Sequence, residues 1–367
     1  MSKTFTVLHD VLKLAVDNNA SDIHIKENCP VAYRIDGALI TSDFIATTEI
    51  IDQFLSEVGT ERQIEEYYRI GDFDLSHRED DVGRFRVNIH RQRNLNSINF
   101  RWVKNTIMTF EQLGLSPVFK QIMEETRGII IMTGTTGSGK STTLAAMLNY
   151  LNESRNDHVI TIEDPIEYEF TDKHCLFEQR EVGLDTISFA SALKHALRQD
   201  PDVIMVGEMR DKDSFEAALQ ASDTGHMVMT TLHASNASQT INRILDFYEK
   251  NEQDSIREAI ALNLKAVISQ RLVPKASGKG RVPATEIMIN TPIVTKLIQE
   301  DRLDRLSSAI AAGQGDGMMT FNQCLLGFVN EGVITEEDAL VASDNPEQLK
   351  MNFEGIFLSA GDNQIIG

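Results

Sequence analysis

Apolar residues in the first hundred positions follow two different periods. Over residues 5–18 they recur at the helical spacing i, i+3, i+4 and i+7, as Leu8, Val11, Leu12 and Ala15. A second helix is expected over residues 48–67, and short runs of strand type lie at residues 22–25, 31–35, 73–76, 84–90 and 98–102. This mixture predicts a small α+β domain over residues 1–104.

The rest of the chain alternates regularly between strand and helix patterns. Strands are expected at residues 129–133, 158–163, 203–207 and 227–231, and helices at 117–126, 141–153, 189–198, 213–222 and 237–247. Such alternation predicts a mostly parallel sheet covered on both faces. Three or more helices are expected to follow, one of them starting at the Thr291-Pro292 pair. We therefore expect a linker over residues 105–116 and an α/β domain with C-terminal helices over residues 117–367.

The bulk properties narrow the class of protein. A length of 367 residues favours two domains over one. No stretch approaches the roughly 18 apolar residues of a membrane span, and the first residues lack the apolar region of a secretory signal. Three cysteines far apart (Cys29, Cys175 and Cys324) suit a reducing cytosol and exclude a four-cysteine zinc site. A formal net charge of −20 argues against nonspecific binding to nucleic acid or anionic lipid. We expect a cytoplasmic protein that binds no nucleic acid and does not insert into a membrane.

One segment reverses this acidic balance. Residues 82–110 contain no aspartate or glutamate and carry Arg84, Arg86, Arg91, Arg93, Arg101 and Lys104. In the predicted strand 84–90, apolar residues alternate with arginines and other polar residues. The arginines are therefore expected to share one face of the strand, opposite the apolar face.

Residues 134–141 form the most specific chemical signature in the chain. They match the phosphate-binding pattern G-x-x-x-x-G-K-[ST], between an apolar strand and a helical pattern, and this context separates a true site from a chance Gly-rich turn. Glycines let backbone N–H groups surround a phosphate chain at a helix N-terminus. We expect Lys140 to reach the β- and γ-phosphates of ATP, and Ser141 to bind Mg²⁺. The expected nucleotide-binding residues are Gly134, Thr135, Thr136, Gly137, Ser138, Gly139, Lys140, Ser141 and Thr142.

Three strand ends downstream carry side chains suited to hydrolysis, at the edge where parallel strands form a binding crevice. Glu208 occupies the Walker B position, although Gly207 stands where an aspartate commonly binds Mg²⁺; Glu208 would act through the metal's waters or on the attacking water. Glu163 is expected to orient or deprotonate that water. His233 is expected to sense the γ-phosphate. Each residue has an alternative interpretation. Glu208 would be a cap at a strand end, Glu163 part of a surface turn, and His233 a structural histidine.

No arginine of the second domain is obviously aimed at the γ-phosphate. Arg84, Arg86 and Arg101 are therefore predicted to act as arginine fingers, on a nucleotide held by the neighbouring domain or by the next subunit. Such fingers neutralise transition-state charge and are worth ~10³-fold or more in rate. The alternatives are a solvated strand face or a surface for an anionic partner.

With these residues the chain resembles, over essentially its whole length, the type IV pilus retraction ATPases, the PilT/PilU group of the secretion ATPase superfamily. The resemblance rests on an ordered set of motifs at residues 20–24, 33–37, 83–88, 134–141, 162–167, 179–183, 200–210, 231–234 and 269–272. Segments 181–186, 262–266, 272–274 and 332–340 are more similar to the PilU side of the group, whereas 207–210 is more similar to the PilT side. Segment 292–300 lacks two arginines of the PilT helix that is thought to couple hydrolysis to retraction.

The resemblance implies a homohexameric ring of subunits with a PAS-like N-terminal domain and a RecA-like C-terminal domain. Nucleotide would be shared across subunits, and hydrolysis would turn the inner-membrane platform protein so that pilin subunits leave the filament. The ring would then lie in the cytoplasm at the inner-membrane base of the pilus machine, alone or beside a sister PilT-type ATPase. The family's roles fall on Lys140 and Ser141 (phosphates and Mg²⁺), Glu163 (water), Glu208 (Walker B and metal), His233 (γ-phosphate) and the three arginines.

Three rival functions stay open at this point. A pilus-assembly or type II secretion ATPase shares the motor but usually carries a long N-terminal extension and a four-cysteine zinc insertion. A RecA-like nucleic-acid motor conflicts with the charge of −20. A subunit that only assists a sister ATPase, without hydrolysis, conflicts with the presence of Lys140, Glu163 and Glu208.

Overall fold

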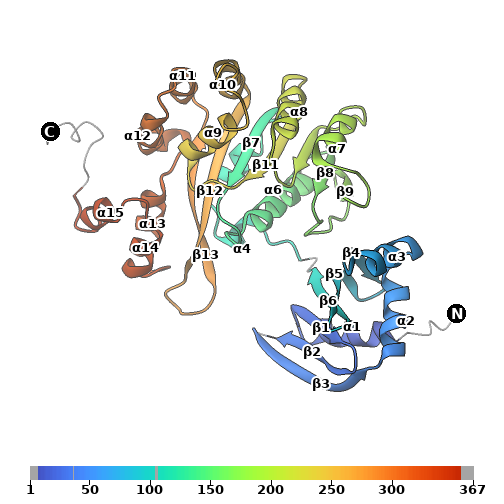
Figure 1. Ribbon diagram of the computed structural model, residues 1–367. Coiled ribbons are helices and arrows are strands. Elements are labelled where there is room, and N and C mark those ends of the chain that lie inside the picture. The colour runs from blue at the N-terminus through green and yellow to red at the C-terminus, as the bar shows by residue number, and fades with distance from the viewer. Residues whose placement is uncertain (1–6, 36, 104–105, 357–367) are drawn as a thin grey trace. The chain divides into compact units, whose positions relative to one another are not determined.

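The computed structural model describes residues 7–35, 37–103 and 106–356 (Figure 1). The chain divides into two compact units, Met1–Thr106 and Ile107–Gly367, each with its own sheet. The predicted helix start at residues 5–6, the basic residue Lys104 and the last residues of the second domain, from 357 on, lie outside the described residues. Within the described ranges, no helix combines the length and the apolar character needed to cross a bilayer.

The first unit is an antiparallel six-stranded sheet, in the order β3-β2-β1-β6-β5-β4, with three helices. One apolar cluster joins helices and strands, with Leu12, Ile23, Phe54 and Phe100 among its buried members. The elements are α1 (Val7–Asp17), β1 (Asp22–Lys26), β2 (Cys29–Ile35), β3 (Ala38–Ala46), α2 (Thr48–Val58), α3 (Glu61–Ile70), β4 (Asp72–Glu79), β5 (Gly83–Gln92) and β6 (Leu95–Val103).

The single helix predicted over residues 48–67 is wrong, because the structure has two helices there. Gly59 leaves the helical conformation after α2. Thr60 then caps α3, accepting from the backbone N–H of Gln63, whose side chain accepts in turn from the N–H of Thr60. This reciprocal capping box starts a new helix and explains the break.

Strand β3 is absent from the sequence-based prediction. Its apolar residues Leu39, Ile40 and Ile45 are about half exposed, at 53%, 50% and 52%. Because β3 lies at the edge of the sheet, it lacks the alternation that marks a half-buried strand.

The second unit confirms the predicted α/β architecture. Its seven-stranded sheet has the order β13-β12-β7-β11-β10-β8-β9, and only β13 runs antiparallel to its neighbour. The strands are β7 (Gly128–Thr133), β8 (His158–Glu163), β9 (Leu176–Glu181), β10 (Val203–Val206), β11 (Met227–Leu232), β12 (Leu264–Pro274) and β13 (Arg281–Ile289). The helices are α4 (Phe110–Leu113), α5 (Val118–Ile122), α6 (Lys140–Ser154), α7 (Phe189–Ala196), α8 (Lys212–Asp223), α9 (Ala237–Leu245), α10 (Gln253–Asn263), α11 (Pro292–Gln299), α12 (Leu306–Ala312), α13 (Phe321–Asn330), α14 (Glu336–Ala342) and α15 (Pro346–Phe353), with two 3-10 turns at Leu303–Arg305 and Gln314–Asp316.

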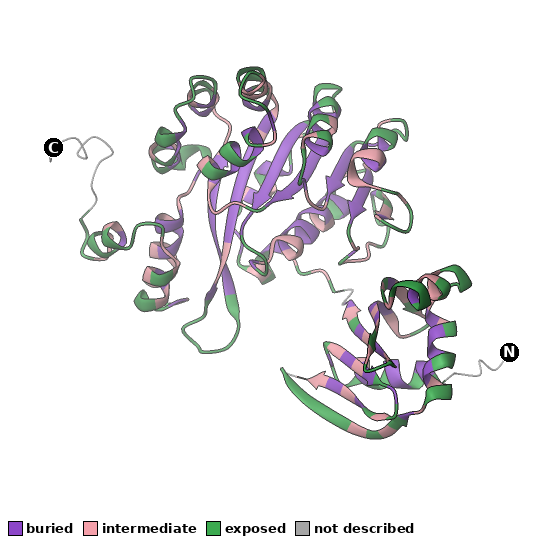
Figure 2. Ribbon diagram, in the orientation of Figure 1, coloured by how far each residue is buried: buried purple, intermediate pink, exposed green. Residues whose placement is uncertain are grey.

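The central strands of this sheet are buried on both faces (Figure 2). Alternate residues of β7 pack into different apolar clusters: Ile129 and Ile131 into one, Ile130 and Met132 into the other. This division is the consequence of the two-residue period of a strand covered by helices on both sides.

Three strands of the second unit were not predicted, namely β9, β12 and β13. The antiparallel hairpin β12–β13 lies where the sequence favoured helices alone. The helix predicted over residues 117–126 is shorter, and α4 forms within the segment expected to be a linker.

Candidate functional site

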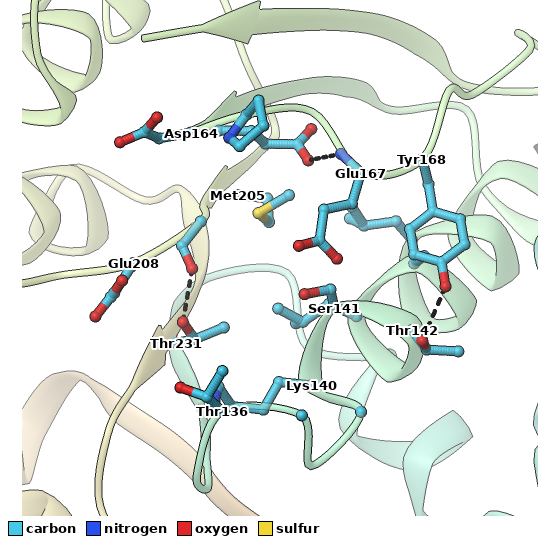
Figure 3. A pocket seen from close by; sticks show the side chains of 18 of the residues that line it. Thr136, Lys140, Ser141, Thr142, Asp164, Glu167, Tyr168, Met205, Glu208 and Thr231 are labelled. Atoms are coloured by element: carbon cyan, nitrogen blue, oxygen red, sulfur yellow. Dashed lines mark hydrogen bonds between the residues drawn. The ribbon is translucent and has the colours of Figure 1, made fainter. Parts of the chain in front are cut away.

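A cavity of about 580 Å³ lies in the second unit, at the carboxyl ends of its parallel strands; we call it the P-loop cavity (Figure 3). Strand ends from β8, β10 and β11 contribute Glu163, Glu208 and His233 to its lining. From the phosphate-binding loop and the helix that follows, the lining residues are Thr136, Gly137, Gly139, Lys140, Ser141 and Thr142. The structure therefore brings the three strand-end residues together with the phosphate-binding loop, from which they are distant in sequence.

The backbone of the loop favours glycine, and two positions illustrate this. Gly139 has φ 88° immediately before α6, and Gly134 has φ 149° after β7. A Cβ atom at Gly134 would lie 2.5 Å from both Gln270 O and Ser138 Oγ. Because left-handed backbone and close approach both exclude a side chain, these glycines are required by the shape of the loop.

Lys140 lies inside the curve of the loop. Its Nζ donates to Gly134 O at 2.8 Å and to Thr135 O at 3.1 Å. Burial lowers the pKa of Lys140, while the charges of Glu208 and Glu167 oppose that shift. The ammonium group is thus held where a phosphate chain enclosed by the loop would meet it.

Gln270 on β12 connects the phosphate-binding loop to the start of α6. This role was not predicted from the sequence. Its buried Nε2 donates to Ser138 O at 2.8 Å, and its Oε1 accepts from Thr143 Oγ1 at 2.9 Å. Only its place within the motif at residues 269–272 gave any signal in the sequence.

Glu163 is a buried carboxyl group held by three donors. Oε1 accepts from Thr161 Oγ1 at 2.7 Å and from Gln179 Nε2 at 3.2 Å, and Oε2 accepts from the backbone N–H of Glu167 at 3.4 Å. Burial raises the pKa of Glu163 because it disfavours the charged form, although these hydrogen bonds act against the shift. A carboxyl group of raised pKa at a cavity wall suits proton transfer.

Glu208 joins the ends of two neighbouring strands. Its Oε2 accepts from Arg210 Nε at 2.8 Å, and its Oε1 lies 3.2 Å from His233 Nε2. The residue before it, Gly207, has its carbonyl bonded by Thr231 Oγ1 at 2.6 Å. A Cβ at Gly207 would lie 3.3 Å from Ile162 O of β8, so this position is crowded for the aspartate that the usual Walker B pattern would place there.

Two arginines of the second unit also line the P-loop cavity, which the sequence analysis did not foresee. Arg210 is engaged by Glu208, whereas Arg281 at the start of β13 forms no ion pair or side-chain hydrogen bond with the residues that the structure describes. No pattern could have indicated Arg281, because its strand was itself not predicted.

The predicted arginine fingers lie in the first unit. Arg86 on β5 pairs directly opposite Arg101 on β6, so both point to the same face of the sheet. Arg101 Nε donates to Asp22 Oδ1 at 2.7 Å. Arg84 is buried and donates to Ser76 Oγ at 3.0 Å, so it is not part of a solvated face.

The P-loop cavity fits a magnesium nucleotide better than a metal alone. Among the described residues, no group of three or more His, Cys, Asp or Glu side chains could hold a metal ion. Mg²⁺ characteristically keeps several waters and takes its other ligands from one or two side chains and from phosphate oxygens. Ser141 and Glu208 line the same cavity and could supply those protein ligands.

Another buried carboxyl group, that of Glu286 on β13, contacts the start of α9, shortly after His233. It is 5% exposed and accepts from the N–H of Ala237, the first residue of α9, at 2.8 Å. Burial raises the pKa of Glu286 from 4.5 to about 7, with Asp344 adding to the shift and Arg271 opposing it. The folded chain therefore binds this proton more tightly than the unfolded chain does.

The substitution Glu286→Gln is expected to flatten the pH dependence of stability. The Glu286 contribution is present below about pH 4.5 and is lost as the pH rises toward 7, an effect of about 3 kcal/mol. Urea unfolding of the parent and the variant at pH 5 and pH 8 measures this loss, with exposed Glu258→Gln as the control. An unchanged slope in the Glu286 variant would contradict the expectation.

Comparison with known proteins agrees with this architecture. The family model described as "Type II/IV secretion system protein" matches residues 2–315. The chain is 40% identical over 339 residues to the type IV pilus retraction ATPase PilT of Pseudomonas aeruginosa, covering 92% of this chain and 98% of that relative. It is 37% identical over 343 residues to the type IV pilus ATPase PilU of the same organism, covering 93% and 90%. Several local motifs are more similar to the PilU side of the group. The overall identities, in contrast, are 40% to PilT and 37% to PilU.

A solved structure extends the similarity to three dimensions. The crystal structure of the pilus retraction motor PilT with bound ADP has a TM-score of 0.88 and 41% identity, covering 95% of this chain and 99% of that one. Together with the family match over most of the chain, this shows that the protein is a member of the type II/IV secretion system protein family.

Proposed function

We propose that this chain is an Mg²⁺-dependent ATPase motor that powers or assists type IV pilus retraction. The observation that carries the proposal is the P-loop cavity, where Lys140, Glu163, Glu208 and His233 converge. The similarity to proteins named as pilus retraction ATPases supplies the direction of the movement.

Each residue of the cavity has a role in this proposal. The loop and Lys140 bind the phosphates of ATP, and Lys140 stabilises charge on the transferred phosphoryl group. Ser141 and, through water, Glu208 would hold Mg²⁺, which would supply positive charge against the phosphates. Glu163 accepts the proton of the attacking water.

His233 links this chemistry to a change of shape. Its Nε2 contacts Glu208 at 3.2 Å, so loss of the γ-phosphate would alter the ion-pair network at the ends of β10 and β11. A local change of charge of this type can shift the equilibrium between two conformations of the protein.

The quaternary arrangement belongs to the same proposal. Residues 1–104 form the PAS-like domain, 105–116 the linker and 117–367 the motor domain, and six copies form a ring. Arg84, Arg86 and Arg101 of one domain act on a nucleotide held by another. The ring lies on the cytoplasmic side of the inner membrane and turns the pilus platform protein, alone or beside a sister PilT-type ATPase.

The test is to count surface pili and measure twitching in a clean deletion strain and in one carrying only Lys140→Ala. A retraction motor predicts excess pili and lost twitching on deletion. The Lys140→Ala strain shows whether the chain's own hydrolysis is needed, because that side chain is required at the phosphates. Loss of pili on deletion would reveal an assembly motor instead and would reverse the proposed direction.

A further inference from the structure

Two consecutive residues of β12 bond to two different segments next to the P-loop cavity. Gln270 donates to Ser138 O in the phosphate-binding loop at 2.8 Å. Arg271 donates through Nη2 to Ser235 O at 3.2 Å, in the segment between His233 and α9. They can do so because successive side chains of a strand point to opposite faces of the sheet.

The guanidinium of Arg271 makes further contacts, all with the C-terminal helices. Nη1 donates to Ala342 O at 2.6 Å, at the end of α14, and Nη2 pairs with Asp344 between α14 and α15. The charged group lies 4.0 Å from the ring centroid of Phe321 on α13. A guanidinium is a rigid planar fork of donors, so these partners are held in a fixed relation to Ser235.

The C-terminal helices otherwise pack in a core of their own. Phe321, Leu325, Ala339 and Leu349 form an apolar cluster with residues of the β12–β13 hairpin, separate from the cluster under α9. A cavity of about 760 Å³ lies beside the Arg271 contacts, lined by polar and apolar residues of α12, α13 and α15 together with Glu286 and Asp344. Helices that share a small core next to a cavity can shift as a group more readily than helices of the main core.

We propose that Arg271 is a positioning residue that sets the segment following His233 and couples nucleotide turnover to a shift of α14 and α15. The proposal rests on the ATPase function proposed above. When His233 responds to the nucleotide, Ser235 O moves with it. Arg271 cannot follow that oxygen without changing its bonds to Ala342 and Asp344.

The kinetic test is Arg271→Lys in the full chain. Lysine keeps the charge but cannot contact Ser235, Ala342 and Asp344 at once, so kcat is expected to fall about tenfold to a hundredfold while KM changes less than about twofold. A purely structural defect would instead lower the number of nucleotide-binding sites in proportion to kcat. Titration with ADP counts those sites, and in Arg271→Lys their number is expected to equal that of the parent.

Arg155→Lys is the matched control. Arg155 has a side chain 21% exposed, against 24% for Arg271, and it also pairs with an aspartate, Asp157. It donates to two backbone carbonyls, Met123 O and Glu125 O, and neither of them belongs to the segment that follows His233 or to the C-terminal helices. Its replacement is expected to cost similar thermal stability and to leave kcat within about twofold of the parent.

Hydrogen exchange tests the coupling directly. On addition of ADP, the parent is expected to change protection both at residues 233–237 and at residues 336–349. In Arg271→Lys only the first segment is expected to respond. If the variant does not fold, Asp344→Asn replaces it, because this change removes a partner on the helix side and keeps the bond to Ser235.

The outcomes separate the two proposals. A parent that neither hydrolyses ATP nor responds to ADP overturns the ATPase function and the coupling together. A parent that is active, with a variant that keeps the parent kcat or still transmits the change to residues 336–349, overturns the coupling alone.

Discussion

Replacing Lys140 with alanine is expected to lower the rate of ATP hydrolysis by about 10³-fold or more. The ammonium group now bonds to Gly134 O and Thr135 O inside the loop, and it is the cation placed to meet the phosphates. Its loss removes charge stabilisation in a partly buried site, where electrostatic interactions are stronger than in water. Phosphate release measures the rate, and calorimetric titration with ADP measures the accompanying loss of affinity.

Lys173→Ala is the control for the loss of a lysine. Lys173 belongs to the same unit and pairs with Glu153 at the surface, away from the P-loop cavity. Surface pairs of this type contribute about 0–1 kcal/mol, so the control should keep the parent rate. A Lys140 variant that hydrolyses ATP at more than a tenth of the parent rate would remove the basis of the proposed function.

Glu163→Gln is expected to lower kcat by about 10²–10⁴-fold while nucleotide affinity stays within about threefold. The amide keeps nearly the same size and can still accept hydrogen bonds from Thr161 and Gln179, but it cannot take a proton from water. Steady-state hydrolysis with ADP titration separates the two quantities. Glu181→Gln, a buried carboxyl on β9 that does not line the cavity, is the matched control. Equal loss of rate in both variants would contradict a specific role for Glu163.

The same substitution is also expected to change how the stability of the folded chain depends on pH. Because burial raises the pKa of Glu163, the folded chain binds its proton more tightly, and the Glu163 contribution to stability falls as the pH rises through that raised pKa. The variant should therefore show a flatter pH profile of stability than the parent. Unfolding by urea across the pH range measures this profile, and an equally steep fall of stability with rising pH in the variant would contradict the assignment.

The chemistry of the cavity could be predicted because its elements are local in sequence. A buried apolar strand, a Gly-rich loop and a helix occupy consecutive residues, so the pattern at 128–154 specifies both the fold and the site. Glu163, Glu208 and His233 then follow from one rule, since carboxyl ends of parallel strands share an edge.

The supports of the cavity could not be predicted, because they depend on contacts between distant segments. Gln270 and Ser138 are 132 positions apart in sequence. Their pairing requires β12 to lie beside β7, and the apolar start of β12 directly follows helix α10 without a turn signal. Arg281 was missed for the same reason, because its strand exists only as the partner of β12.

In the N-terminal unit, the sequence pattern predicted which residues are buried in the core but not how the arginines are placed. The alternation in β5 correctly indicated buried Phe85, Val87 and Ile89. It also placed the arginines together on the opposite face, with a solvated face as one alternative, yet Arg84 is buried against Ser76, a residue of the neighbouring strand. A one-strand pattern carries no information about how long side chains fold back on adjacent strands. The role of the arginines at a nucleotide stays a prediction.

The two-residue period of β12 makes insertions and deletions in this strand more damaging than single substitutions. A point substitution at Gln270 or Arg271 weakens the support of one segment next to the cavity and leaves the support of the other in place. The loss or gain of a single residue in this strand would reverse every side chain beyond it, sending the glutamine toward the helices and the arginine toward the loop. The length of β12, more than its composition, is therefore under constraint. Insertions should be tolerated in the turn at residues 275–280, where the hairpin reverses and the count of residues no longer decides which way a side chain points.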